Sequence, residues 1–128
     1  MKKPEEIIIA AEKEALEKWS KGDTSGFAAL STDEMTYFDP TLEKRLDGGN
    51  AFKEYMSSLH GKFHIDRFEI LYPKVQLHGD VGILTFNLNN YSKDGKITSR
   101  WNSTEVYHLI GGEWKIIHSH WSNPKSEK

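Results

Sequence analysis

The stretch WKIIHSHWS, residues 114–122, decides how the C-terminal half of the chain is interpreted. Its side chains alternate, with Trp114, Ile116, His118 and His120 on one side and Lys115, Ile117, Ser119 and Trp121 on the other. A period of two is typical of a β-strand with two different faces. The segment therefore predicts a strand whose one face begins apolar and ends in two histidines.

The same period extends back through the chain to residue 64. We expect strands over residues 64–78, 81–91, 97–110 and 113–122, with a bend or an edge at Pro73, which cannot donate to a ladder. The pairs Asp94-Gly95 and Gly111-Gly112 are typical of tight hairpin turns. These signals together predict a meander of long antiparallel strands.

Helix signals come before the strands. Pro4 suits a first helical turn and Gly22 suits the stop, so a helix is expected between them, with Glu12, Lys13, Glu17 and Lys18 on its solvated face. A short helix over 24–30, a brief strand over 34–39 and a third helix beginning at Asp47 or Asn50 follow. The fold class is therefore α+β: N-terminal helices packed on a strongly bent antiparallel sheet, with a cavity between the two layers.

The turn at Gly111-Gly112 sets an expected strand register. Counting outward places Glu105 opposite His118 and Ser103 opposite His120, and directly opposed residues share a face. This is the face that meets the helices, so these four side chains are expected at one end of the cavity, with a raised pKa for His118 beside the Glu105 carboxylate. A β-bulge would shift the register by one residue.

Composition limits the classes of function. The chain has 128 residues, a net charge of −2 and no cysteine, which excludes disulfides and gives no electrostatic footprint for nucleic acid or an anionic membrane. Residues 1–19 contain no long apolar run, so neither a signal peptide nor a membrane span is expected. We expect one cytoplasmic domain over residues 1–128 that ends in a polar tail, residues 123–128.

Several motifs carry a family resemblance. YFDP at residues 37–40, RWNSTEVY at 100–107 and the closing WKIIHSHWS resemble the SnoaL-like branch of the nuclear transport factor 2-like superfamily. Residues 72–124 also resemble the association (hub) domain of calcium/calmodulin-dependent protein kinase II, through PKVQLHGD, TEVY and GEWKIIHSH. The resemblance implies a cystatin-like cone, dimeric through its sheet, in a group of isomerases, cyclases, dehydratases and hubs. Asn87, Glu105 and Trp121 stand where that hub's pocket would have arginines.

The two histidines admit three interpretations. A strand pair at i and i+2 can hold a metal with Glu105 as third ligand, can form a hydrogen-bonded polar core layer, or can face a ligand and transfer protons. We favour the last two and expect no metal and no cofactor. His118 and His120 are accordingly candidate catalytic residues.

Asp39 is the third candidate catalytic residue. It is either a turn former before Pro40 or a carboxylate at the cavity mouth that acts as general base. The steroid-isomerase branch uses an Asp base with Tyr and acid donors, and this sequence offers Asp39 or Glu105 as base and Tyr37 or Tyr55 as donor. The candidate ligand-binding residues are Trp19, Tyr37, Tyr55, Trp101, Ser103 and Glu105.

The other strand face is expected to be an interface. Val106, Ile117 and Trp121 would form an apolar stripe on it, which predicts a homodimer. The sequence thus indicates a homodimeric domain that binds a small molecule of unknown identity in a semi-polar cavity, either as a binding protein or as an isomerase, cyclase or dehydratase-type enzyme. The alternative is a non-catalytic, hub-like assembly module with a vestigial pocket.

Overall fold

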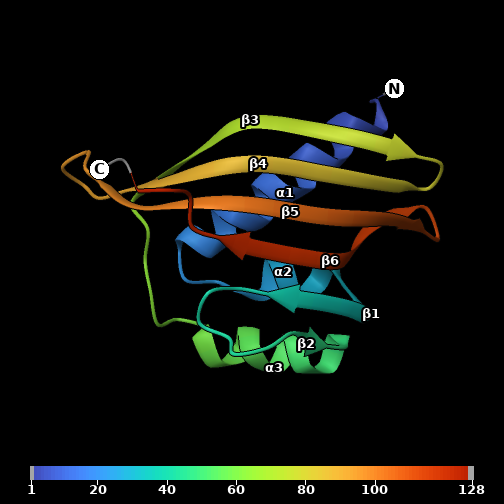
Figure 1. Cartoon of the computed structure of the whole chain (residues 1–128), viewed down its shortest axis with the longest axis horizontal. Coiled ribbons are helices and arrows are strands. Elements are labelled where there is room, and N and C mark those ends of the chain that lie inside the picture. Colours follow the sequence, from blue (N-terminus) through green and yellow to red (C-terminus); the bar gives the residue numbers. More distant parts are fainter. Residues whose placement is uncertain (1, 127–128) are drawn as a thin grey trace.

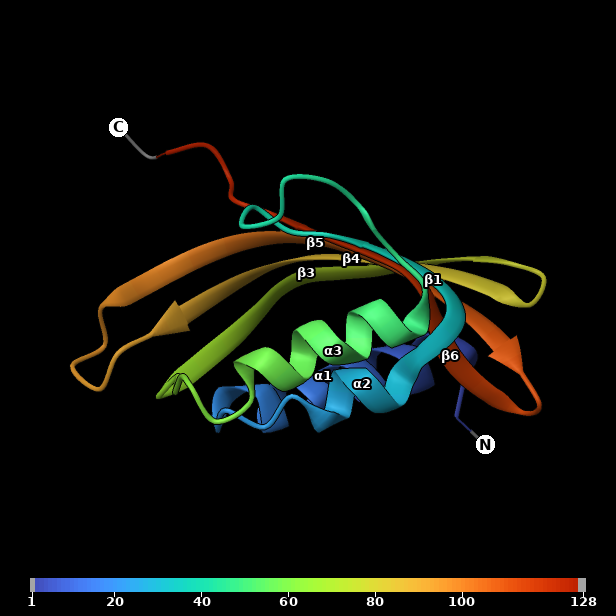
Figure 2. The ribbon, with the colours of Figure 1, turned by 90° about the horizontal axis from the view of Figure 1, so that it is seen from below.

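The computed structural model describes residues 2–126 as an arched sheet whose concave face is covered by helices (Figures 1 and 2). The elements in chain order are α1 (Pro4–Ser20), α2 (Ser25–Leu30), β1 (Ser31–Phe38), β2 (Leu46–Asp47), α3 (Gly49–Leu59), β3 (Arg67–His78), β4 (Val81–Tyr91), β5 (Ile97–Ile110) and β6 (Glu113–Ser122). The predicted α+β cone is confirmed.

Helix α1 follows its sequence signals except at one position. Pro4 occupies the first turn, and Ile8, Ala15 and Leu16 are buried against the sheet. Glu12, which was expected on the solvated face, is 1% exposed because it lies on the same buried stripe. A charged residue therefore sits inside the core.

The first strand is inserted beside the last. The strand order is β2-β1-β6-β5-β4-β3, in which β3 to β6 form the predicted meander and β1 runs parallel to β6 (Figure 1). Helix α1 packs against β3 and β4, whereas α3 packs against β1 and β2. This arrangement places the end of β1 close to the end of β6.

The register between β5 and β6 differs from the prediction. Leu109 lies opposite Trp114 and Tyr107 opposite Ile116, as counted from the turn. The register then shifts, because β6 contributes one extra residue, Ile117, between the pairs Tyr107–Ile116 and Val106–His118.

This β-bulge shifts every pair beyond it by one residue relative to the predicted register. Glu105 lies opposite Ser119, and Ser103 lies opposite Trp121. The predicted pairs Glu105–His118 and Ser103–His120 are therefore wrong. Since one extra residue exchanges the faces of a strand, Ser119 and Trp121 turn to the concave face and the histidines turn to the convex face.

Strand β4 alternates without interruption along the cavity. Leu84, Phe86, Leu88 and Asn90 are buried, and the residues between them are more exposed. Gly82 begins this buried series, where a Cβ atom would stand 2.6 Å from Ile8 Cδ1. The glycine therefore allows α1 to approach the sheet closely.

Smaller differences concern the ends of elements. Helix α3 has Gly48 as its N-cap, without a side-chain cap, instead of beginning at Asp47 or Asn50. Strand β3 begins at Arg67, three residues later than predicted. Of the predicted tail, residues 123–126 form neither helix nor strand, and residues 127–128 lie outside the described residues. Within residues 2–126, no helix combines the length and apolar character that crossing a membrane requires.

Candidate functional site

A cavity of about 360 Å³ lies between the helices and the concave face of the sheet. All three helices, four strands and the loops after β1 and α3 contribute to its wall. The lining residues are Leu16, Trp19, Phe27, Tyr37, Asp39, Pro40, Thr41, Phe52, Tyr55, Met56, Leu59, Phe63, Ile65, Leu88, Asn90, Ser99, Trp101, Ser119 and Trp121. Most of these side chains are apolar or aromatic.

Asp39 is the carboxylate of this cavity. Tyr37 Oη donates to its Oδ2 at 2.9 Å, and Tyr55 Oη donates to the same atom at 2.6 Å. The backbone N–H of Thr41 donates to Oδ1 at 2.9 Å and its hydroxyl donates at 2.7 Å. The hydrogen bond from the Thr41 N–H, two residues after Asp39, is typical of an Asp that forms a turn. Asp39 therefore stabilises the loop and also lines the cavity.

These contacts keep Asp39 ionised. Partial burial raises the pKa of its carboxyl, but the hydrogen bonds from Tyr55, Thr41 and Tyr37 together outweigh burial and hold the pKa below its ordinary value of 3.8. For Tyr37, burial and then the negative charge of Asp39 raise the pKa. At neutral pH the site is thus a carboxylate held by neutral hydroxyl donors.

Three pairs of aromatic rings stand on the wall. Trp19 packs against Phe63 with 4.5 Å between ring centroids, and Trp101 meets Trp121 edge to face at 6.2 Å. Tyr37 lies 5.8 Å from Tyr55 on the side of Asp39. The wall is therefore rich in ring faces and edges.

The indole N–H groups of two tryptophans are already used. Trp101 Nε1 donates to Ser99 Oγ at 3.2 Å, and Trp121 Nε1 donates to Ser119 Oγ at 3.0 Å. Each serine lies two residues before its tryptophan on the same strand. These bonds satisfy polar atoms that would otherwise be buried without a partner.

Asn90 is the amide group of the wall. Its Nδ2 donates to Ser99 Oγ at 3.0 Å, whereas its Oδ1 is buried without a hydrogen-bond partner among the described residues. The whole residue is only 5% exposed. Asn90 therefore lines the cavity, but its Oδ1 atom itself is closed off from the open space.

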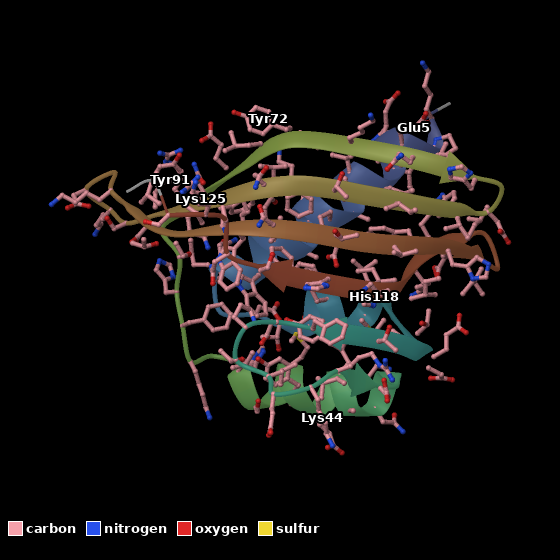
Figure 3. All side chains as sticks on the ribbon, in the orientation of Figure 1. Glu5, Lys44, Tyr72, Tyr91, His118 and Lys125 are labelled. Atoms are coloured by element: carbon pink, nitrogen blue, oxygen red, sulfur yellow. The ribbon has the colours of Figure 1, made fainter. Side chains whose placement is uncertain are left out.

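The histidines lie on the other face of the sheet. His118 (labelled in Figure 3) has its Nδ1 2.8 Å from Thr36 Oγ1. The His120 ring lies 5.0 Å from the Phe38 ring. Neither lines the cavity, because of the bulge at Ile117. Partial burial and the neighbouring His120 lower the pKa of His118, opposite to the predicted direction.

Glu105 and Ser103 lie on the concave side but do not line the cavity. Glu105 is fully buried, beside Glu12 and Ser119. Burial and then the charge of Glu12 raise the pKa of Glu105 well above its ordinary value. Tyr107 Oη donates to Glu12 Oε1 at 2.7 Å.

Of the predicted site residues, the structure brings Trp19, Tyr37, Asp39, Tyr55 and Trp101 together at the cavity. It adds Asn90, Ser119 and Trp121, which the sequence reasoning missed. Asn90 carried a signal, since it is a polar residue at an inward position of the alternating strand β4. Trp121 carried none, because its face depends on the bulge. Across residues 2–126, no cluster of three His, Asp or Glu residues is placed to hold a metal ion.

The chain matches a known protein family over nearly its whole length. Residues 4–125 match the family model of the calcium/calmodulin dependent protein kinase II association domain. A Parabacteroides distasonis protein described as a candidate ketosteroid isomerase is 36% identical, with a TM-score of 0.87, and the match covers 99% of this chain and 92% of that protein.

Two further solved structures share the fold at lower identity. A nuclear transport factor 2-like protein of unknown function from Pseudomonas putida KT2440 is 22% identical, with a TM-score of 0.82 and coverage of 97% of this chain and 89% of that one. The hub of calcium/calmodulin dependent protein kinase II from S. rosetta is 21% identical, with a TM-score of 0.75 and coverage of 97% and 99%. At such identities the likeness is one of fold.

Proposed function

Since the chain belongs to the calcium/calmodulin dependent protein kinase II association domain family, we propose that it is a self-associating domain that binds a small molecule in the cavity beside Asp39. The observation that carries the binding function is the cavity itself. Its volume of about 360 Å³ falls within the range of small-molecule sites, and such sites combine apolar walls with a few placed polar groups.

Family membership supports self-association. The matched family is an association domain, and a hub from S. rosetta shares the fold. Among the described residues no helix covers the convex face of the sheet, and the loop between β1 and β2 rises above part of it, so the rest of the arched face is open to a second copy (Figure 2). We propose a dimer through this face, with Val106 rather than Trp121 as its apolar residue, because Val106 lies opposite His118 on the convex side.

Binding fits the chemistry of Asp39 better than proton abstraction from carbon. A general base works best with a pKa near the working pH, whereas the pKa of Asp39 lies below 3.8. The Tyr37 and Tyr55 hydroxyls also donate to Asp39 and so are not free for a substrate oxygen. The resting arrangement is that of an anionic binding group.

An isomerase is the second candidate. The relative described as a candidate ketosteroid isomerase is 36% identical over nearly the whole chain, and Asp39 with Tyr55 supplies a base and a donor. Such a reaction requires the Tyr55 hydroxyl to break its hydrogen bond to Asp39 and to donate to a substrate oxygen instead. A steroid isomerisation assay that detects turnover in the native chain and none in Asp39→Asn would establish this function in place of simple binding.

A fragment screen by thermal shift and NMR tests the binding function. The library should contain neutral, cationic and anionic aromatic compounds. Bound compounds should lose affinity in Trp101→Ala, which removes part of the cavity wall, and keep it in Tyr72→Ala, since Tyr72 is 79% exposed and lies outside the lining. A screen without a compound that meets both conditions would leave the assembly module as the function.

A further inference from the structure

We infer that the cavity selects an aromatic or aliphatic amine in its cationic form, with the ammonium group beside Asp39. This inference rests on the proposed binding function and names its ligand class. Three features of the wall carry it: the charge of the lining residues, the engagement of the wall's hydrogen-bond donors within the wall itself, and the aromatic rings.

The lining of the cavity carries a negative charge and no positive charge among the described residues. Asp39 is the only Asp, Glu, Lys, Arg or His among the described residues that line the cavity. The groups that hydrogen-bond to it, from Tyr37, Tyr55 and Thr41, are neutral, so they stabilise the carboxylate without cancelling its charge. A ligand cation at this position gains a charge-assisted contact, whereas a ligand carboxylate meets like charge and no basic partner.

Four hydrogen-bond donors of the wall are already engaged within the wall itself. The hydroxyls of Tyr37 and Tyr55 donate to Asp39, and the indoles of Trp101 and Trp121 donate to serines of the wall. A ligand carboxylate would therefore have to displace one of the existing bonds of the wall to gain any of these four donors.

The aromatic walls favour the same ligand. An ammonium group near the face of Trp or Tyr is attracted by the ring quadrupole, and the attraction grows as water is excluded. Tyr37 and Tyr55 flank Asp39, and the Trp19–Phe63 and Trp101–Trp121 pairs supply apolar surface for the body of the ligand. The wall therefore suits a compound that is cationic at one end and apolar at the other.

A matched series of indoles tests the charge preference by isothermal titration calorimetry at pH 7. Tryptamine, tryptophol and indole-3-propionate share the ring and nearly the same chain, but carry a positive, zero and negative charge. We expect tryptamine to bind about tenfold or more tighter than tryptophol, a difference typical of a desolvated charge pair. Indole-3-propionate should bind most weakly.

Asp39→Asn should remove the difference in affinity between tryptamine and tryptophol, because it removes the charge that distinguishes the two ligands. The matched control is Asp33→Asn, an exposed Asp on β1 that does not line the cavity and precedes the loop of Asp39, which should leave the difference intact. Equal affinities for tryptamine and tryptophol in the native chain, or tighter binding of the carboxylate, would overturn the inference but keep the cavity as a binding site. Failure of all three compounds also overturns the inference, and the fragment screen then decides separately whether the cavity binds anything.

Discussion

Glu12 and Glu105 are two acidic residues that are buried together in the core. Burial raises the pKa of Glu12 to about 7, since apolar surroundings disfavour its charge more than its hydrogen bonds stabilise it. Burial and then the charge of Glu12 also raise the pKa of Glu105 well above its ordinary value. The pair therefore destabilises the fold as the pH rises.

The expected effect can be measured in Glu12→Gln. The folded state binds more protons than the unfolded state between pH 4.5 and about 7, so native stability falls as the pH rises through this window. The variant keeps an acceptor for Tyr107 and removes the ionisation. Its free energy of unfolding at pH 8 should exceed the native value by on the order of 2 kcal/mol, with no gain at pH 4.

Chemical denaturation at several pH values provides the measurement. Glu14→Gln, an exposed position on the same helix, is the control and should change stability by less than about 0.5 kcal/mol. A native chain whose stability does not fall between pH 5 and 7 would contradict the raised pKa of Glu12.

His118 gives a second prediction at the scale of single residues. Its pKa should lie below 6.5 in an NMR titration, because partial burial and His120 disfavour the imidazolium. Its contribution to stability is then complete above pH 6.5 and is lost as the pH falls below that value. Glu105→Gln should leave the titration unchanged, whereas His120→Asn should raise the pKa. A shift in Glu105→Gln would mean that the two side chains share a face after all.

At the scale of elements, the sequence specified the strands but not the bulge. Alternation and turn residues located β4, β5 and β6 at their observed bounds. The extra residue falls where Ile116 and Ile117 are both apolar, so the pattern fits either face. Packing decides: the observed register buries Ser119 and part of Trp121 while His120 stays exposed, which gains apolar burial and avoids burying imidazoles.

The same reason explains which site residues were predictable. Tyr37, Asp39, Tyr55, Trp19 and Trp101 lie before the bulge or on other elements, and their faces follow from local periodicity. Ser119, Trp121, His118 and His120 lie after it. Their faces depend on contacts with β1 and the helices, which no local pattern contains.

Deletion of Ile117 tests the bulge. The deletion restores regular pairing only by turning His118 and His120 inward and Trp121 outward, so we expect a loss of roughly 3 kcal/mol or more, or failure to fold. Ile117→Ala keeps the extra residue and should cost about 1 kcal/mol or less, because this side chain is only half-buried. Thermal unfolding followed by circular dichroism compares the two. Similar losses in both variants would show that the bulge does not determine the faces.

At the scale of the whole molecule, the open question is assembly. Light scattering at micromolar concentration should give the mass of a dimer or larger. Val106→Arg places a charge on the convex face and should shift the mass towards the monomer, whereas Ser57→Arg, on the exposed side of α3, should not. A monomeric native chain would contradict self-association, and a dimeric Val106→Arg would place the interface elsewhere.

The parallel pairing of β1 with β6 has a consequence for the order in which the chain acquires its cavity. Contacts such as Thr32 Oγ1 to the Ile116 carbonyl span 84 positions, so the early strand has no neighbour on this side until the last strand has left the ribosome. Contacts of such long sequence separation form slowly. Asp39 and its tyrosines therefore gain Ser119 and Trp121 as neighbours only after β6 has been synthesised, and the wall of the chamber cannot be complete before then.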